Sequence, residues 1–206
     1  MQNINILENG LVVVPLAGNS SRFQHVSDAP KYLLQIKGKL MIEWALDNIG
    51  AEPEQLIFII RHDHQQEFGV TKILQGLFGN SIHTIVVNST EGAAQTVLCS
   101  KLLINNSKPL VIRDGDCIID APIGITDDIA AQVTYYSPRG ESLTDRRNKS
   151  YVSFDSTGKV INIREKQIIS NHAICGMYVF SKGASFVRLA EKAVRHQQKS
   201  KGEYYI

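Results

Sequence analysis

Apolar runs and amphipathic stretches alternate along the first half of the chain. Four short runs have the composition of strands buried within a sheet: Leu11–Pro15, Leu56–Ile60, Ile82–Val87 and Pro109–Ile112. Three stretches between them space apolar residues at the helical period: Met41–Ile49, His64–Phe78 and Gly92–Ile104. This rhythm of strand and then helix predicts a mainly parallel sheet with helices on both faces.

The second half contains strands without long helices between them. The predicted strands are Val133–Tyr136, Tyr151–Phe154, Val160–Ile163 and Ile174–Phe180. Asp155–Gly158 has the composition of a hairpin turn, Ala184–His196 is a predicted final helix, and the polar segment Arg139–Ser150 is a predicted mobile loop. We therefore expect one α/β domain over residues 1–206, a Rossmann-like three-layer αβα sandwich with a mostly parallel, mixed central sheet. Its halves are residues 1–120 and 121–206.

Composition and charge restrict the class of protein. The chain has 206 residues, of which 43% are hydrophobic and 20% charged, and its net charge is +2 with acids and bases mixed. Nucleic-acid and membrane-surface proteins usually carry a basic patch or stripe, so we expect neither partner. No apolar run approaches the ~20 residues that span a bilayer, and the N-terminus lacks a charged, cleavable leader pattern. We expect a cytoplasmic protein, and its three scattered cysteines indicate neither zinc nor a disulfide scaffold.

Small and polar residues follow three of the predicted strands, at 16–31, 88–95 and 113–116. Ligands of open α/β sheets bind outside the carboxyl ends of strands. In the first segment, a loop of small residues offers backbone N–H groups to phosphate oxygens, Arg22 can fork onto a phosphate, and Lys31 can neutralise another. The segment is neither a Walker A loop nor Gly-x-Gly-x-x-Gly. From spacing alone, a surface turn with two solvated bases explains it equally well.

The fragment His62-Asp63-His64 has the residue types of a metal site. Histidines two positions apart do not share a helix face, and no third ligand is evident in the sequence. We therefore favour a polar helix start. Asp114 forms an Asp-x-Asp pair with Asp116, which supports a role for the 113–116 segment without establishing it.

Several motifs, in their order, resemble those of the sugar-phosphate nucleotidyltransferases. The most specific is Pro-Leu-Ala-Gly-x-x-Ser-Arg-Phe at 15–23, followed by Pro-Lys at 30–31 and Gly-Lys at 38–39. The others are Thr-Glu-Gly-Ala-Ala-Gln-Thr at 90–96, Gly-Asp at 115–116, Glu-Lys at 165–166 and Gly-Met-Tyr-Val-Phe at 176–180. The likeness spans nearly the whole chain.

The resemblance implies a nucleotide-binding half over 1–120 and a substrate-binding half over 121–206. Arg22 and Lys31 would hold a triphosphate, Asp116 would hold Mg²⁺, and Lys166 would bind the phosphate of the second substrate. Gly92 would let the base approach the backbone, and Gln95 would hydrogen-bond its edge. The implied catalytic residues are Arg22, Lys31, Asp116 and Lys166. The implied nucleotide-binding residues are Leu16, Ala17, Gly18, Asn19, Ser20, Ser21, Arg22, Lys31, Gly92 and Gln95. The implied residues for the second substrate are Glu165, Lys166 and Gly176.

The expected function is transfer of a nucleoside monophosphate from a triphosphate to a sugar 1-phosphate, with release of pyrophosphate, for surface polysaccharide precursors such as those of a capsule. A CTP-dependent enzyme acting on a non-sugar phosphate, of the choline phosphate kind, is an alternative, and so is a nucleotide-binding protein that has lost turnover. Single residues have simpler explanations too: Asp116 as a turn cap, Lys166 as a solvated lysine, and Gln95 as a surface residue. The oligomeric state stays open, a homo-oligomer included.

The chain departs from the family pattern at three places. Ser20 stands where the family usually has a second glycine, and a side chain there could crowd a triphosphate. Gln167 stands where the family has proline after Glu-Lys. The chain ends at Ile206, whereas the family continues after its Gly-Glu-Tyr-like stretch, so we expect the second half to be incomplete and turnover to be impaired.

Overall fold

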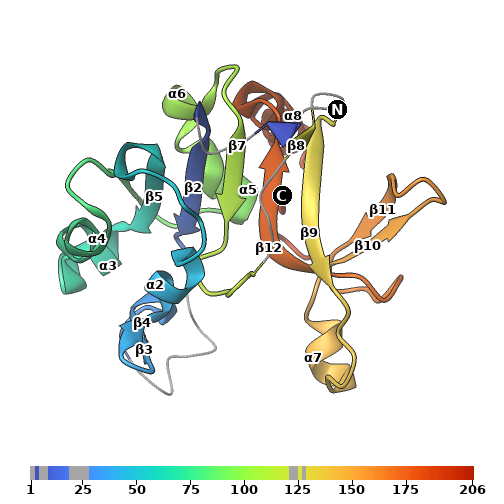
Figure 1. Ribbon diagram of the computed structural model, residues 1–206, viewed down its shortest axis with the longest axis horizontal. Helices are drawn as coiled ribbons and strands as arrows, with labels where there is room; N and C mark the ends of the chain where they lie inside the picture. The colour runs from blue at the N-terminus through green and yellow to red at the C-terminus, as the bar shows by residue number, and fades with distance from the viewer. Residues whose placement is uncertain (1–2, 5–8, 19–27, 121–124, 127–128) are drawn as a thin grey trace. The chain divides into compact units, whose positions relative to one another are not determined.

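The computed structural model describes residues 3–4, 9–18, 28–120, 125–126 and 129–206 (Figure 1). The chain forms two compact units. Unit 1 comprises Met1–Gln132 and Tyr178–Ile206, and unit 2 comprises Val133–Met177. The end of the chain, which the sequence assigned to the second half, therefore returns to the unit that contains the first half.

Unit 1 is organised around a sheet in the order β12-β7-β2-β5-β6 (Figure 1). Its strands are β2 (Leu11–Leu16), β5 (Leu56–Arg61), β6 (His83–Val87), β7 (Leu110–Arg113) and the end of β12 (Ala173–Phe180). β2 pairs in parallel with β5 and β7, and β5 pairs in parallel with β6. Val12, Val13 and Val14 in the central strand are all 0% exposed, because helices cover both faces of the sheet.

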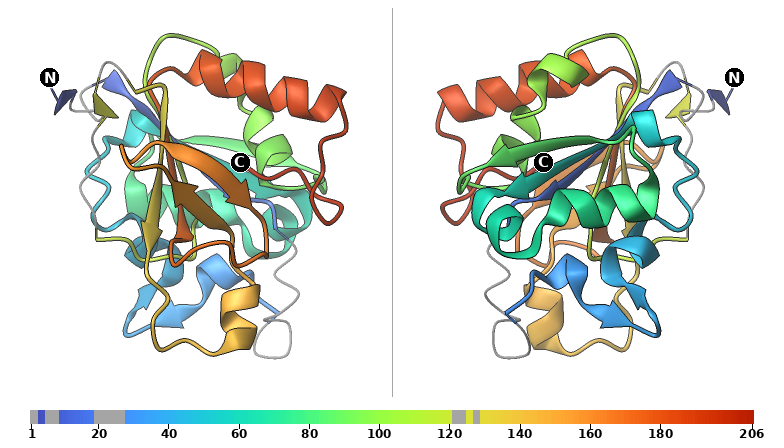
Figure 2. Two further views of the ribbon diagram at one scale, coloured as in Figure 1. Left: turned by 90° about the vertical axis from the view of Figure 1, so that its right-hand side faces the viewer. Right: turned by 90° about the vertical axis from the view of Figure 1, so that its left-hand side faces the viewer.

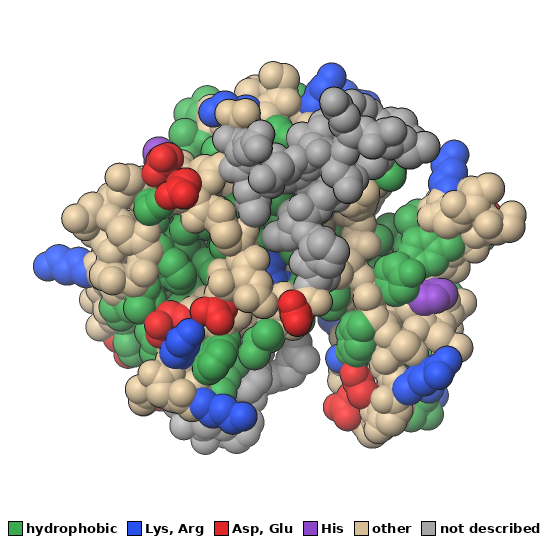
Figure 3. Space-filling model, viewed as in Figure 1, with side chains coloured by type: hydrophobic (Ala, Val, Ile, Leu, Met, Phe, Trp, Pro, Cys, Tyr) green, Lys and Arg blue, Asp and Glu red, His purple; other side chains and the backbone are tan. Residues whose placement is uncertain are grey.

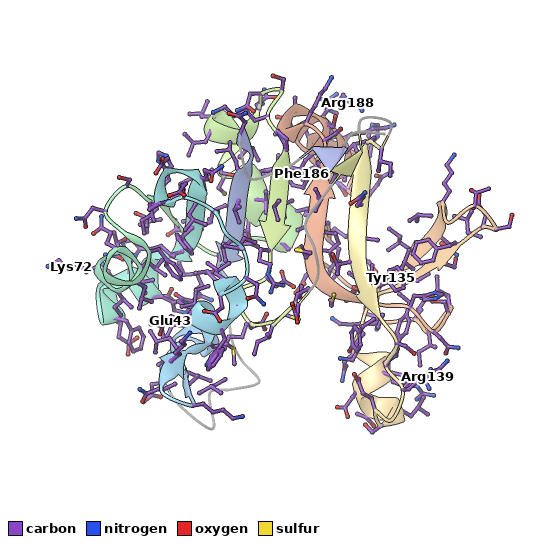
Figure 4. All side chains as sticks on the ribbon, viewed as in Figure 1. Glu43, Lys72, Tyr135, Arg139, Phe186 and Arg188 are labelled. Atoms are coloured by element: carbon purple, nitrogen blue, oxygen red, sulfur yellow. The ribbon has the colours of Figure 1, made fainter. Side chains whose placement is uncertain are left out.

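The helices of unit 1 form the two outer layers of the predicted sandwich (Figure 2). α5 (Ala93–Leu98), α6 (Lys101–Ile104) and α8 (Gly183–Arg195) cover one face, where Val97, Ile104 and Phe186 pack on Val13 and Ile112. α3 (His62–Phe68) and α4 (Val70–Phe78) cover the other face, where the ring of Phe78 stacks on that of Phe58 at 5.4 Å. Figure 4 shows Phe186 directed toward the strands and Lys72 of α4 directed away from them.

Two predicted helices are each divided in the structure. The His64–Phe78 stretch ends one helix at Gly69 and starts the next there, because Gly69 adopts the left-handed conformation (φ 61°) that stops an α-helix. The Gly92–Ile104 stretch breaks at Cys99 and Ser100, where the Ser100 hydroxyl donates to the carbonyl of Val97. Such local side-chain bonds compete with the helical ladder.

Shorter elements complete unit 1. They are β1 (Asn3–Ile4), which pairs antiparallel with β8 (Ile125–Thr126), the hairpin of β3 (Gln35–Ile36) and β4 (Lys39–Leu40), α2 (Met41–Leu46), and the 3₁₀ turns η2 (Lys31–Leu33) and η3 (Pro53–Gln55). The sequence predicted α2 within Met41–Ile49 and none of the others. Pairs of two-residue strands carry too little periodicity to be recognised.

Unit 2 is antiparallel, which makes the sheet of the chain mixed. β10 (Tyr151–Phe154) pairs antiparallel with β11 (Val160–Arg164) and with the start of β12, and β9 (Ala131–Tyr136) also pairs with β12. The predicted turn at Asp155–Gly158 is confirmed: the Asp155 carboxylate accepts hydrogen bonds from the backbone of Thr157 and Lys159, and Gly158 has a φ of 83°. The rings of Tyr135, Phe154 and His172 contact one another, with centroids 4.8 to 5.3 Å apart, and Figure 4 labels Tyr135.

The predicted loop Arg139–Ser150 contains a helix, α7 (Leu143–Arg147). The Ser142 hydroxyl caps it by accepting from the backbone N–H of Asp145. The polar composition of the segment hid this single capped helix, which the sequence did not predict, and the mobility of the segment stays a prediction.

The described surface agrees with the mixed charge of the sequence. On the face drawn in Figure 3, acidic and basic side chains are interspersed and form no continuous basic stripe. Among the described helices, none is long and apolar enough to cross a membrane.

Candidate active site

Three parallel strands bring the predicted segments to one edge of the unit 1 sheet. β2 ends at Leu16, β7 at Arg113 and β6 at Val87, and parallel pairing through β5 places these carboxyl ends on the same side. Gly115 lies directly on Leu16, since a Cβ at Gly115 would overlap the Leu16 side chain and lie 3.1 Å from Cδ1 of Ile42. Glycine at 115 therefore allows the loop after β7 to pack on the loop after β2.

Lys31 and Asp116 form an ion pair at this edge. They are 85 residues apart in the sequence, and the structure joins the Lys31 ammonium to the Asp116 carboxylate with each side chain about a third exposed. Lys31 begins the η2 turn, which follows Pro30. The two residues that the resemblance assigned to triphosphate and to metal are therefore in direct contact.

Asp114 lies on the same loop as Asp116. Burial, reinforced by the neighbouring Asp116 carboxylate, raises the pKa of Asp114 from 3.8 to about 6, against the opposing effect of Lys31 and Arg113. Two carboxylates close enough to disfavour each other's charge are a place where a cation is stabilised. Asp114 is therefore close enough to Asp116 and Lys31 for their charges to act on it, in line with the supporting role predicted for it.

Arg113 anchors this loop and was missed in the sequence. Its side chain is 2% exposed, and its guanidinium donates to the carbonyl of Ala45 (3.1 and 2.8 Å) and to that of Cys117 (2.7 Å). One buried fork thus ties the loop 114–117 to the last turn of α2. The available signal was a charged residue at the end of an otherwise apolar strand, immediately before two aspartates.

Tyr32, the neighbour of Lys31, is held by a contact with α3. Its ring is 2% exposed, and its hydroxyl is 3.1 Å from Nδ1 of His64 on α3. Burial raises the pKa of Tyr32 and lowers that of His64, which keeps both side chains neutral near pH 7. Asp63 pairs with Arg61, and no group of three or more His, Cys, Asp and Glu in the described part of the chain is arranged to hold a metal ion. The His62-Asp63-His64 fragment is the start of α3, as predicted, and His64 within it contacts the η2 turn through Tyr32.

The loop after β6 is folded on itself. Its threonine hydroxyls, Thr90 and Thr96, lie 2.5 Å apart, and the Oε1 of Gln95 accepts from the backbone N–H of Glu91 at 2.5 Å. Gly92 has a φ of 120°, and a Cβ there would lie 2.5 Å from the carbonyl oxygen of Tyr204. The approach of the Tyr204 backbone is therefore a structural reason for glycine at 92, separate from the predicted approach of a base.

Unit 2 holds the residues assigned to the second substrate. The Glu165 carboxylate accepts a hydrogen bond from the Ser150 hydroxyl, and it lies 3.6 Å from Nζ of Lys166. Lys166 and Gly176 both have a positive φ, of 52° and 74°. For a lysine this backbone conformation is uncommon, so Lys166 is held at a tight turn that presents its side chain beside Glu165.

The remaining predicted nucleotide-binding residues lie in the segment 16–22, which the structure describes only in part. Leu16 and Ala17 are buried, at 5% and 6% exposure, and Gly18 is exposed with open space where a Cβ would stand. Asn19, Ser20, Ser21 and Arg22 lie outside the described residues. Their assigned roles stay predictions.

Ligands of open α/β sheets bind outside the carboxyl ends of the strands, which is where Lys31, Asp114 and Asp116 lie. The sequence matches the nucleotidyl transferase family over residues 13–204. The chain therefore belongs to this family.

Curated relatives match part of the chain. The bifunctional protein GlmU of Mycobacterium tuberculosis and that of Mycobacterium bovis are each 31% identical over 114 residues, which is 53% of this chain. The match covers 23% of the length of those relatives. Their remaining length has no counterpart in this comparison.

Solved structures match nearly the whole chain. A nucleoside-diphosphate-sugar pyrophosphorylase from Vibrio cholerae superposes with a TM-score of 0.76 at 22% identity, over 95% of this chain and 84% of that one. A putative glucose-1-phosphate thymidylyltransferase from Bacillus anthracis gives 0.71 at 20% identity, over 92% and 78%. An inositol-1-phosphate CTP transferase from T. maritima gives 0.64 at 18% identity, over 90% and 81%. At these identities the likeness establishes the fold.

Proposed function

We propose that the protein transfers a nucleoside monophosphate from a triphosphate to a phosphorylated small molecule, a sugar 1-phosphate in the first instance, and releases pyrophosphate. The observation that carries the proposal is the contact between Lys31 and Asp116 at the carboxyl edge of a parallel sheet, with Asp114 beside them. A site of this composition binds phosphate charge and a hard cation together.

The reaction needs no protein nucleophile. A phosphate oxygen of the second substrate attacks the α-phosphorus in line, the bond to the β-phosphate oxygen breaks, and pyrophosphate leaves with that electron pair. Catalysis then consists of positioning and of neutralising negative charge. Lys31 supplies a positive charge to the phosphate oxygens, and Arg22 is predicted to supply another.

The donor set of the β7 loop fits Mg²⁺. Asp116 and Asp114 offer hard carboxylate oxygens, and Mg²⁺ is commonly bound by one or two carboxylates together with substrate phosphates and waters. Burial, followed by the neighbouring Asp116 carboxylate, raises the pKa of Asp114, and a divalent cation beside the two carboxylates would stabilise the charged form. When bound, the ion neutralises phosphate charge as it builds up in the transition state.

Positioning within unit 1 comes from groups that do not touch the ligands. Arg113 holds the aspartate loop through Ala45 and Cys117, and the Tyr32–His64 contact holds the turn that begins with Lys31. In unit 2, Lys166 stays the predicted ligand of the second substrate's phosphate, with Glu165 beside it. The predicted role in surface polysaccharide synthesis follows from the resemblance alone, and the cytoplasmic location stays an expectation from the sequence.

Release of pyrophosphate from a panel of triphosphates tests the proposal. ATP, CTP, GTP, UTP and dTTP are each combined with sugar 1-phosphates, choline phosphate and inositol 1-phosphate, with and without Mg²⁺. We expect Mg²⁺-dependent release for at least one pair that contains a sugar 1-phosphate, a loss of at least ~100-fold in Asp116→Asn, and little change in the matched variant Asp120→Asn, which alters an exposed aspartate.

Each other outcome has a defined meaning. Activity only with CTP and a non-sugar phosphate would replace the sugar substrate by the alternative. Triphosphate binding without release from any pair would indicate a protein that has lost turnover. Normal turnover by Asp116→Asn would remove Asp116 from the site.

A further inference from the structure

The final residues of the chain lie against the loop that follows β6. After α8 the chain turns back within unit 1 (Figure 2), and a tight turn forms in which the backbones of Ser200 and Glu203 exchange hydrogen bonds of 2.9 and 3.0 Å. This turn presents Tyr204, which is 4% exposed, to the loop at residues 90–95. We call residues 199–204 the tail and residues 90–95 the glycine loop.

Backbone hydrogen bonds join the tail to the glycine loop on both sides of Gly92. The N–H of Tyr204 donates to the carbonyl of Glu91 at 2.7 Å, and the N–H of Ala94 donates to the carbonyl of Tyr204 at 3.0 Å. Gly92 lies between these bonds, and its missing side chain leaves the space that the Tyr204 backbone occupies. The tail therefore extends the glycine loop as a short strand would.

A side-chain contact also joins the tail to the glycine loop. The ammonium of Lys199 is 2.6 Å from the carboxylate of Glu91, and it lies 5.0 Å from the centre of the Tyr204 ring. The hydrogen bond to Glu91 raises the pKa of Lys199, which keeps the lysine charged. One lysine thus holds both the start of the glycine loop and the ring of the residue that pairs with it.

We propose that the tail is a positioning element for nucleotide recognition, in which the Lys199–Glu91 pair and the backbone of Tyr204 set the shape of the glycine loop. This inference rests on the proposed function, together with the family resemblance, which implies that Gly92 and Gln95 meet the base of the triphosphate. The side chain of Gln95 already contributes its oxygen to Glu91 N–H, so the position of Glu91 also determines where the Gln95 amide lies. Displacing Glu91 would move the group predicted to meet the base.

A charge-swap cycle tests the tail without removing it. Glu91→Lys, Lys199→Glu and the double variant are compared with wild type, and the double variant has the net charge of wild type. Lys201→Glu is the matched control, because it makes the same charge change on an exposed lysine of the same turn. Glu91→Lys combined with Lys201→Glu completes a control cycle.

The readouts are the dissociation constant for each Mg²⁺-triphosphate, measured by calorimetry, and amide hydrogen exchange at Ala94 and Tyr204. We expect non-additivity of about two- to five-fold in the dissociation constant for the Glu91/Lys199 cycle, as an exposed ion pair provides, and additive effects in the control cycle. Exchange at Ala94 and Tyr204 should accelerate in Lys199→Glu and return toward wild type in the double variant. The coupling should shrink at high salt.

Two results would overturn the inference. The first is an additive Glu91/Lys199 cycle for triphosphate binding. The second is coupling that appears in thermal unfolding or amide exchange but not in triphosphate binding, because the tail would then stabilise the loop without positioning it for a nucleotide. If wild type binds none of the triphosphates, the proposed function itself fails and the nucleotide role of the tail fails with it; the amide exchange would still show whether the tail holds the loop.

Discussion

Two loops at the carboxyl edge of the unit 1 sheet are held in place by different kinds of interaction. The loop 114–117 is tied by the buried guanidinium of Arg113 to two backbone carbonyls, whereas the glycine loop is tied by the tail through backbone hydrogen bonds and an ion pair between half-exposed side chains. A buried polar anchor is costly to remove because its partners lose their hydrogen bonds in a dry environment. A solvent-exposed pair is replaced by water at little cost.

This difference predicts that the side-chain anchor of the loop 114–117 contributes more to stability than the side-chain anchor of the glycine loop. The loop that carries the aspartates is the proposed Mg²⁺ site, and Mg²⁺ demands near-ideal octahedral geometry from its ligands. The glycine loop is predicted to meet the base, which is the part of a triphosphate that differs between nucleotides. Because the side-chain anchor of the glycine loop is the weaker one, this loop could change its nucleotide specificity while the loop 114–117 stays the same.

The largest expected effect on stability is that of Arg113→Met. The variant keeps the length of the side chain and removes the donors to Ala45 and Cys117, so we expect a loss of about 2–4 kcal/mol in the free energy of unfolding. Urea denaturation measures it. Arg164→Met, at the exposed end of β11, is the matched control and should change stability by less than ~0.5 kcal/mol. Equal losses in both variants would show that Arg113 is not a special anchor.

Gly92→Ala should have the next largest effect. A Cβ at 92 would meet the Tyr204 backbone and also force alanine into a positive φ, so we expect a loss of at least ~1 kcal/mol. Gly158→Ala separates the two causes, because Gly158 has a φ of 83° with open space around its Cβ position. A larger loss in Gly92→Ala than in Gly158→Ala assigns the excess to the tail; equal losses would leave backbone strain as the whole explanation.

Asp114→Asn should stabilise the metal-free protein in a pH-dependent way. The pKa of Asp114 is about 6 in the folded chain against an ordinary 3.8, so the folded state binds the proton more tightly and loses stability as the pH rises from 4 to 7. Asparagine removes this cost. We expect a gain on the order of 1–3 kcal/mol at pH 8 and little gain at pH 4, measured in the presence of a chelator.

The exposed variant Asp120→Asn serves as the control for this experiment, and it should change stability by less than ~0.5 kcal/mol at either pH. If Asp114→Asn gives no advantage at pH 8, the charge of Asp114 is compensated within the loop. The case for a cation beside Asp116 would then be weaker.

The smallest expected effect is that of Lys199→Met. Loss of an exposed ion pair should lower the melting temperature by ~2 °C or less, and Lys201→Met should leave it unchanged. Comparison with Arg113→Met measures the contrast between the two loops directly. If urea denaturation shows that Lys199→Met loses as much free energy of unfolding as Arg113→Met, the two anchors do not differ in strength.

The fold was largely predictable from the sequence because its central strands are continuous apolar runs. Val12–Val14 and the run from Leu56 are buried on both faces, and such runs are hard to mistake when helices alternate with them. The predictions failed where one residue interrupts a pattern, as Gly69 and Ser100 do, and where a short element lies in a polar segment, as α7 does.

The sequence motifs predicted which residues belong to the candidate site. They did not predict which residues hold its loops in place. Lys31 and Asp116 stood out because each belongs to a motif that follows a predicted strand, and their roles stay predictions. Arg113, Tyr32 and Tyr204 did not, because each acts through contacts with residues distant in the sequence. Periodicity and motif spacing contain no information about which backbone carbonyl a buried guanidinium will reach, or which glycine a tail will approach.

The central claim is that the protein transfers a nucleoside monophosphate from a triphosphate to a sugar 1-phosphate. Following the label of a labelled triphosphate tests this claim most directly. Wild type and Asp116→Asn are each incubated with Mg²⁺, a sugar 1-phosphate and the preferred triphosphate labelled at either the α- or the γ-phosphorus. Nucleotidyl transfer predicts that wild type moves the α-label into the sugar product and the γ-label into pyrophosphate, and that Asp116→Asn does neither at a comparable rate. Appearance of the γ-label in the sugar product or in inorganic phosphate, or unchanged α-label transfer by Asp116→Asn, would contradict it.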